Sequence, residues 1–199
     1  MRENYQPFDI GKHFVIVPPA AKLPDSERHQ LIMERGAFGS GEHETTRSCL
    51  ELIESLPVNQ DYKILDLGSG TGILTISTLF LNPSSRAWCV DIDPAAVQSC
   101  RNNCQLNGIT HQVTHIQGPL EQLAENHFNL ILANIYGDIL LNVAEGLINK
   151  AVPGAYLLLS GILWEYNFDV KKRYQALGCK LIKSRLLEEF STLLLQKQS

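Results

Sequence analysis

Three glycines at alternate positions, Gly68, Gly70 and Gly72, stand at the centre of the stretch KILDLGSGTGILTIST (63–78). The apolar run before them is interrupted only by Asp66 and is typical of a buried parallel strand, and the apolar run after them predicts a helix. A glycine turn between a strand and a helix N-terminus lets the backbone approach a ligand closely and presents N–H groups to it. These residues therefore predict a site for a nucleotide-like ligand.

The spacing of the glycines distinguishes between ligand classes. The dinucleotide pattern G-x-G-x-x-G, counted from Gly68, requires a glycine where Ile73 stands, so that pattern fails. The pattern D-x-G-x-G-x-G is instead the form found in S-adenosylmethionine (SAM) methyltransferases. We expect Gly68, Ser69 and Gly70 to bind the methionine end of SAM, with an ordinary strand-to-helix turn as the alternative.

A second group of residues is placed to bind an adenosine. The segment 85–93 predicts a strand that ends at Asp91, where two carboxylate oxygens can accept hydrogen bonds from both ribose hydroxyls. Asp93, just before a proline, is expected to cap the next helix instead. A turn at Pro119 follows the third predicted strand, on the side where the adenine edge would lie. We expect Asp91, Ile92 and Pro119 to bind the cofactor.

The segment FNLILANIYG (128–137) contains the predicted reaction centre. It begins as an apolar strand, and Asn134 and Tyr136 stand at its carboxyl end, where doubly wound sheets bind their ligands. The Asn134 oxygen and the following carbonyl can accept hydrogen bonds from an amine, and the Tyr136 ring can attract a cation. We therefore predict that both are catalytic, the alternative being a polar turn with a half-buried tyrosine.

A glycine loop and a helix precede the central motif. Residues 36–41 hold three glycines, and Thr45 and Thr46 are expected to start a helix that runs through Leu56. Composition alone favours an ordinary capped helix after a glycine loop. The position of the loop, just upstream of the first strand of the motif, lets it fold over the ligand site as a lid. His43 is interpreted as a hydrogen-bonded lid residue rather than as a general base.

The elements that position these residues alternate along the chain. After the fourth strand we expect one helix over 138–152, a strand over 153–161, a helix over 165–178 and a hairpin over 179–197. This order predicts an α/β, Rossmann-like class I SAM-dependent methyltransferase fold. Its sheet has seven mostly parallel strands with a C-terminal antiparallel hairpin, and helices cover both faces.

The first 36 residues are expected to be a linker-like extension, and residues 37–199 the methyltransferase domain. Within the extension, the stretch around Phe14 and Ile16 predicts a short strand or hairpin arm, whereas 26–36 predicts a loop or one short helix.

Composition bounds the possible functions. The chain has 199 residues, 44% of them hydrophobic, and a net charge of −4, which fits one domain with a substantial core. The absence of a Lys/Arg-rich run argues against direct nucleic-acid binding, and no apolar run is long enough for a membrane span. Five cysteines fit a reducing cytoplasm. Cys100 and Cys104 lie one helical turn apart, but no matching pair follows nearby, so no metal site is expected.

The segments AFGSGEHETT, LDLGSGTGIL, VDIDPAAV, NCQLNG, LANIYGDIL and PGAYLLLSGIL, with the final EEF, resemble the ribosomal large-subunit protein 11 methyltransferases (PrmA). The resemblance runs from Ile10 to the C-terminus. It implies that Thr46, Gly68, Asp91 and Asn134 bind SAM. It also implies N-methylation of protein amines, lysine side chains or α-amino groups, with a ribosomal protein as the partner.

Members of that family carry a further N-terminal domain that docks the ribosomal protein, and this sequence begins at something like the linker that follows it. Either another substrate or a lost docking domain is therefore expected. Ser69 stands where many members have cysteine or threonine. A small-molecule N- or O-methyltransferase and a non-catalytic SAM-binding protein are the main alternatives. A nucleic-acid methyltransferase is disfavoured by the acidic charge, and a nicotinamide dehydrogenase by Ile73.

Overall fold

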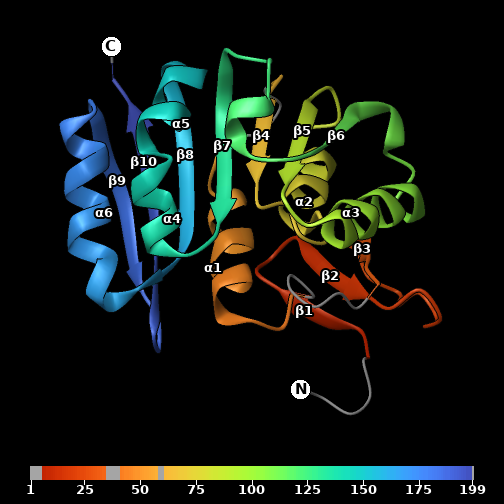
Figure 1. Cartoon of the computed structure of the whole chain (residues 1–199). Coiled ribbons are helices and arrows are strands. Elements are labelled where there is room, and N and C mark those ends of the chain that lie inside the picture. The colour runs from red at the N-terminus through yellow and green to blue at the C-terminus, as the bar shows by residue number, and fades with distance from the viewer. Residues whose placement is uncertain (1–5, 35–40, 58–60, 199) are drawn as a thin grey trace.

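The computed structural model of the chain describes residues 6–34, 41–57 and 61–198. The larger of its two sheets is built from β4 (Lys63–Leu67), β5 (Arg86–Asp91), β6 (Val113–Gln117), β7 (Phe128–Asn134), β8 (Ala151–Leu163), β9 (Cys179–Leu186) and β10 (Phe190–Lys197). These seven strands lie in the order β6-β5-β4-β7-β8-β10-β9 (Figure 1). The smaller sheet contains three strands from the N-terminal segment.

The large sheet has the predicted topology. Strands β6, β5, β4, β7 and β8 are parallel, whereas β10 runs antiparallel to both β8 and β9. The expected C-terminal hairpin is therefore confirmed. The strand order reverses at β4, which has β5 on one side and β7 on the other. The carboxyl ends of these strands open onto one edge, the lower edge in Figure 1, and ligands bind at such a reversal.

Helices cover both faces of this sheet because its central strands are apolar on both sides. On β7, Leu130 and Leu132 belong to one hydrophobic cluster, and Ile131 and Ala133 belong to the other. The first cluster is covered by α1 (Glu44–Ile53), α2 (Ile73–Leu81) and α3 (Pro94–Leu106). The second is covered by α4 (Gly137–Asn142), α5 (Ala144–Lys150) and α6 (Trp164–Ala176). Because successive side chains on a strand point to opposite faces of the sheet, alternate residues belong to the two hydrophobic clusters.

The single helix expected over 138–152 is wrong, because the chain forms α4 and α5 with a break at Val143. Val143 has φ −91° and ψ 1°, outside the helical values, and its side chain lines the cavity at the sheet edge. Tertiary packing therefore ends the first helix within a segment whose local pattern is continuous.

The N-terminal segment forms the small sheet from β1 (Phe8–Ile10), β2 (Phe14–Val17) and β3 (His29–Ile32). The antiparallel pair β1–β2 confirms the expected hairpin arm. The loop or short helix expected over 26–36 is wrong for the described part, because β3 pairs in parallel with β2. Strand β3 is only four residues long and is held by its pairing with β2. A local sequence pattern does not reveal such a distant partner.

The small sheet is attached to the large one through α3. The side chain of Asn107 accepts a hydrogen bond from the Ile32 N–H and donates one to the Ile32 carbonyl, and Asn103 accepts one from the Glu34 N–H. Leu31 and Met33 are buried in the same cluster as the residues under α2 and α3. The expected boundary between residues 36 and 37, and most of the predicted lid, lie outside the described residues.

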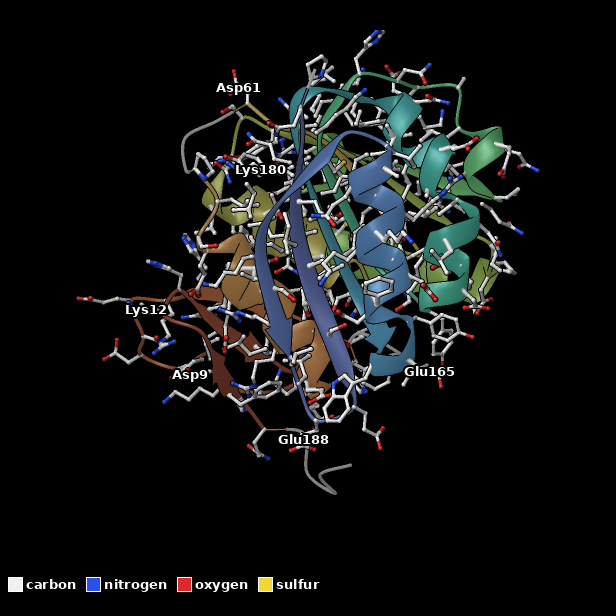
Figure 2. All side chains as sticks on the ribbon, turned by 90° about the vertical axis from the view of Figure 1, so that its left-hand side faces the viewer. Asp9, Lys12, Asp61, Glu165, Lys180 and Glu188 are labelled. Carbon is white, nitrogen blue, oxygen red and sulfur yellow. The ribbon has the colours of Figure 1, made fainter. Side chains whose placement is uncertain are left out.

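The hairpin β9–β10 closes the sheet beside the candidate site. Figure 2 shows Glu188 at the tip of this hairpin, at the same end of the molecule as Glu165 near the start of α6. The Glu44 carboxylate accepts hydrogen bonds from the N–H groups of Glu188 and Glu189, at 2.8 and 3.3 Å. The first turn of α1 therefore holds the hairpin tip. Among the described residues, no helix combines the length and apolar character needed to cross a membrane.

Candidate functional site

A cavity of about 680 Å³ opens at the carboxyl edge of β4, β5, β6 and β7. This volume is in the range of pockets that enclose a small organic ligand. Most of the predicted site residues line it, namely Gly68, Gly70, Asp91, Ile92, Pro119, Asn134 and Tyr136. Two do not: Thr46 is buried on α1, and Ser69 has a buried hydroxyl with no hydrogen-bond partner in the described residues. Their expected part in binding the cofactor stays a prediction.

The glycine turn forms the floor of the cavity. Gly68, Gly70 and Gly72 have φ values of 69°, 54° and 80°, which side chains rarely allow. A Cβ at Gly68 would also lie 2.3 Å from Cγ2 of Ile135, so only glycine fits there. Helix α2 begins at Ile73, directly after the glycine turn as predicted, and the backbone thus lies open to the cavity at a helix N-terminus.

Asp91 ends β5 as predicted, and both of its carboxylate oxygens are oriented by the backbone. One accepts a hydrogen bond from the Gly70 N–H and the other from the Asp93 N–H, each at 3.0 Å. The Gly70 bond joins the carboxylate directly to the glycine turn. Asp93 caps α3 through the Ala95 N–H at 2.8 Å, which confirms its predicted structural role.

The far wall of the cavity is apolar. Ile92 is 73% exposed at the mouth, an unusual position for a large aliphatic side chain, and Pro119 lies in the turn after β6. Leu120 and Ile139 also line this part. A flat apolar ring system is the kind of group that such a wall accommodates.

The carboxyl end of β7 is connected to α1 by a chain of hydrogen bonds. The Asn134 amide donates from Nδ2 to Oγ1 of Thr45 at 3.2 Å, and that hydroxyl is 2.8 Å from Nδ1 of His43. Since the hydroxyl accepts from Asn134, its own proton points to His43. Because Nδ2 of Asn134 is used in this bond, the amide oxygen of Asn134 is the atom that can accept a hydrogen bond from a ligand. Thr45, which the sequence analysis considered only as a helix start, is thus a site residue.

His43 is part of the structure of the helix start. It replaces the predicted threonine as the N-cap of α1, because its Nδ1 accepts from the Thr45 N–H at 3.3 Å. Its ring also packs edge-on against Phe190 of β10. A neutral ring whose Nδ1 accepts carries its proton on Nε2, so it has no lone pair there to act as a base. This geometry favours the hydrogen-bonded role over the general base.

Tyr136 stands at the rim, and the residue before it is tightly enclosed. The Tyr136 side chain is 55% exposed, at the start of α4. The Ile135 N–H donates to the Ser160 carbonyl at 3.1 Å, and a Cβ at Gly161 would lie 2.7 Å from the Ile135 oxygen. Gly161, on β8, is therefore a residue that the sequence analysis missed. Its role depends on the close approach of its backbone, on β8, to the Ile135 carbonyl just after β7.

The fold and this site define a class. A solved structure described as a ribosomal protein L11 methylase from Lactobacillus delbrueckii subsp. bulgaricus superposes with a TM-score of 0.89 at 23% identity, covering 98% of this chain and 100% of that one. An RNA methyltransferase from Salinibacter ruber in complex with S-adenosyl-L-homocysteine gives a TM-score of 0.59 at 19% identity, covering 76% and 89%. The chain has the class I methyltransferase fold, as predicted.

The sequence comparisons identify the family within that class. The family model for ribosomal protein L11 methyltransferase (PrmA) matches residues 1–198. A relative from Trichlorobacter lovleyi, named ribosomal protein L11 methyltransferase, is 40% identical over 180 residues, which are 87% of this chain. The chain belongs to the ribosomal protein L11 methyltransferase family, and the predicted resemblance is confirmed. The matched region spans 58% of the length of that relative.

Proposed function

We propose that this chain transfers the methyl group of SAM to an amine of a protein, either a lysine side chain or an α-amino group, with a ribosomal protein as the substrate. The single observation that carries the proposal is the bond from Nδ2 of Asn134 to the Thr45 hydroxyl, at the mouth of the cavity. This bond fixes the amide so that its oxygen is the group available to an incoming N–H donor. The names of the relatives support a ribosomal protein as the acceptor.

The residues present fit SAM. The glycine turn, in which Gly68 admits no Cβ, would hold the methionine end against a helix N-terminus. Asp91 would accept from the ribose hydroxyls, and Ile92 and Pro119 would flank the adenine. Thr46 belongs to the same proposal through the family resemblance, and Ser69 through its place in the glycine turn. When bound, SAM supplies a methyl group already activated on a sulfonium, and family membership and fold imply its use.

The residues of the chain would then act mainly by position. The Asn134 oxygen and the Ile135 carbonyl would accept hydrogen bonds from the substrate amine and direct its lone pair into the cavity. The Tyr136 ring at the rim would attract the positive charge of the reacting groups. Positioning of this kind, with water excluded, can supply most of the rate enhancement for a reactive donor.

The acceptor must be a neutral amine. A free lysine has a pKa of about 10.4, so its proton must leave before transfer. Loss of that proton is favoured when the amine is buried against the apolar wall of the cavity, because burial disfavours the charged form of the amine. The rate is accordingly expected to rise with pH for a lysine acceptor. The five cysteines are buried free thiols, which supports the expected reducing, cytoplasmic location.

The test is an alanine substitution with a control on the same strand. Asn134→Ala should abolish most methyl transfer and leave SAM binding weakened but measurable by calorimetry. Asn129→Ala is the matched control, since Asn129 stands near the other end of β7 and its side chain accepts from the Lys63 N–H at 2.7 Å. The control should lower stability without removing transfer. Undiminished turnover in Asn134→Ala would remove Asn134 from the mechanism.

The acceptor class is tested with the unmodified chain. Radiolabelled SAM is offered with purified ribosomal proteins in one assay and with a panel of small-molecule amines and alcohols in another. Label on protein supports the proposal. Label on a small molecule alone would favour the alternative small-molecule enzyme, and tight SAM binding with no transfer would favour a non-catalytic binding protein.

A further inference from the structure

Two thiols and an imidazole meet in the core behind the glycine turn. Cys89 on β5 and His115 on β6 are direct partners in the parallel ladder, so their side chains leave the sheet on the same face. Helix α3 covers that face and brings Cys100 to them. One ligand atom from each of the three residues lies within 4.8 Å of the other two. The sheet register thus brings Cys89 and His115 together, and the packing of α3 on the sheet adds Cys100.

The cluster contains a polar atom without a partner. Nδ1 of His115 is sealed from solvent and has no hydrogen-bond partner within the described part of the chain. Cys89 and Cys100 are 1% and 0% exposed. A buried imidazole nitrogen left unpaired costs free energy, and a nitrogen of this ring lies within 4.8 Å of two sulfurs, which are weak hydrogen-bond partners. The site is therefore short of a partner for its nitrogen.

We propose that Cys89, Cys100 and His115 bind a Zn²⁺ ion. Thiolate and imidazole are the ligands that zinc prefers, whereas magnesium and calcium prefer oxygen. Two thiolates, one neutral imidazole and one divalent cation sum to zero charge, and a neutral assembly is the one that a buried position tolerates. This inference goes beyond the proposed methyl transfer and does not depend on it.

The geometry needs only a small adjustment. Zn–S and Zn–N bonds of about 2.3 and 2.1 Å place ligand atoms roughly 3.5 to 3.8 Å apart around a tetrahedral ion. The observed limit of 4.8 Å is thus closed by a contraction of at most about 1.3 Å, within reach of side-chain rotations.

The proposed ion would also stabilise the SAM site. A Cβ at Gly72 would lie 2.6 Å from the Cys100 sulfur, so this sulfur touches the backbone that caps α2. On the same helix, Asn103 donates to the Thr71 carbonyl at 2.9 Å. An ion bound by β5, β6 and α3 would hold these elements against the glycine turn. The expectation of no metal site required a matching pair nearby in sequence, and the fold supplies one from two distant strands.

The test uses the full chain, reduced and freed of metal by a chelator. Titration with Co²⁺ should saturate at one equivalent and give a thiolate-to-cobalt charge-transfer band, which one equivalent of Zn²⁺ then removes. Cys100→Ser and His115→Gln should each weaken binding at least tenfold. Cys179→Ser is the control, because Cys179 is a buried free cysteine in the other hydrophobic cluster, and it should bind as the unmodified chain does.

The outcomes are distinct. Failure of the unmodified chain to bind one equivalent, or an unchanged band in Cys100→Ser, would overturn the proposal. Should Cys100→Ser not fold, X-ray absorption on the unmodified chain with one equivalent of Zn²⁺ decides. A shell containing sulfur together with nitrogen supports the site, and a shell of oxygen and nitrogen alone refutes it. Zinc should also raise the unfolding midpoint of Cys179→Ser but not of His115→Gln.

Discussion

The pair Asp91 and Asp93 offers a controlled test of the cofactor site, because both carboxylates border the same cavity. The change in each case is aspartate to asparagine, which removes one negative charge and keeps the shape. Only Asp91 is joined to the glycine turn, through the Gly70 N–H at 3.0 Å. Asp91→Asn should weaken SAM binding strongly, and Asp93→Asn should change it little.

The magnitude follows from counting acceptor sites. A carboxylate offers about four, and at Asp91 the N–H groups of Gly70 and Asp93 use two, which leaves two for the two ribose hydroxyls. An asparagine loses one oxygen and the charge. One charge-assisted bond of about 1.5 to 3 kcal/mol disappears, and the other falls by about 1 kcal/mol. The total of about 2.5 to 4 kcal/mol raises Kd on the order of a hundredfold to a thousandfold.

The assay is calorimetric titration of each variant with SAM, after circular dichroism has shown that both are folded. Asp93→Asn keeps its helix cap, since asparagine is as good an N-cap as aspartate. Its Kd should therefore stay within a few-fold of the original. Equal weakening in both variants would mean that general charge, not the Asp91 geometry, binds the ligand. An unchanged Kd in Asp91→Asn would refute the assignment of the ribose site.

Three further predictions concern the reaction centre and the core. Thr45→Val removes the hydroxyl that accepts from Asn134, at a loss of about 1 to 3 kcal/mol. Methyl transfer should therefore fall roughly fivefold to 150-fold, while the Kd for SAM changes little. An unaltered rate would contradict this. Gly161 and Gly154 both have a left-handed backbone, but of the two only Gly161 has a carbonyl in the way of a Cβ. Denaturant unfolding should therefore show Gly161→Ala to be less stable than Gly154→Ala by about 1 to 3 kcal/mol. Equal losses would disprove the close approach. Burial raises the pKa of Asp66 from its ordinary 3.8 to about 7, so between these values the folded chain keeps a proton that the unfolded chain has lost. The free energy of unfolding of the metal-free protein should then fall as pH rises from about 4 to about 7, and Asp66→Asn should flatten that fall; identical pH profiles would exclude this cause.

The sheet was predictable because its pattern is local and strong. KILDL and FNLILA read directly as strands buried on both sides, and each polar residue that matters follows such a run, so Asp91 and Asn134 could be placed at the sheet edge. The glycine spacing and the cap at Asp93 depend on backbone geometry within a few residues. Such features leave a signature in the sequence itself.

The parts that could not be predicted depend on distant partners. Strand β3 exists because β2 lies beside it, and the break at Val143 follows from packing at the cavity. Thr45 became a site residue through its contact with Asn134 on another element. In the same way, Cys89 and His115 face each other only because of the register between β5 and β6. No spacing rule within the chain contains that information.

The proposed transfer of a methyl group to a protein amine is best tested on the ribosomal protein after which the relatives are named. The chain is incubated with SAM and purified ribosomal protein L11, and the product is mapped by peptide mass spectrometry. Methyl groups are expected on a lysine side chain or the α-amino group, and Asn134→Ala should remove them. Tight SAM binding without methylation of any protein amine, or equal methylation by Asn134→Ala, would contradict the proposal.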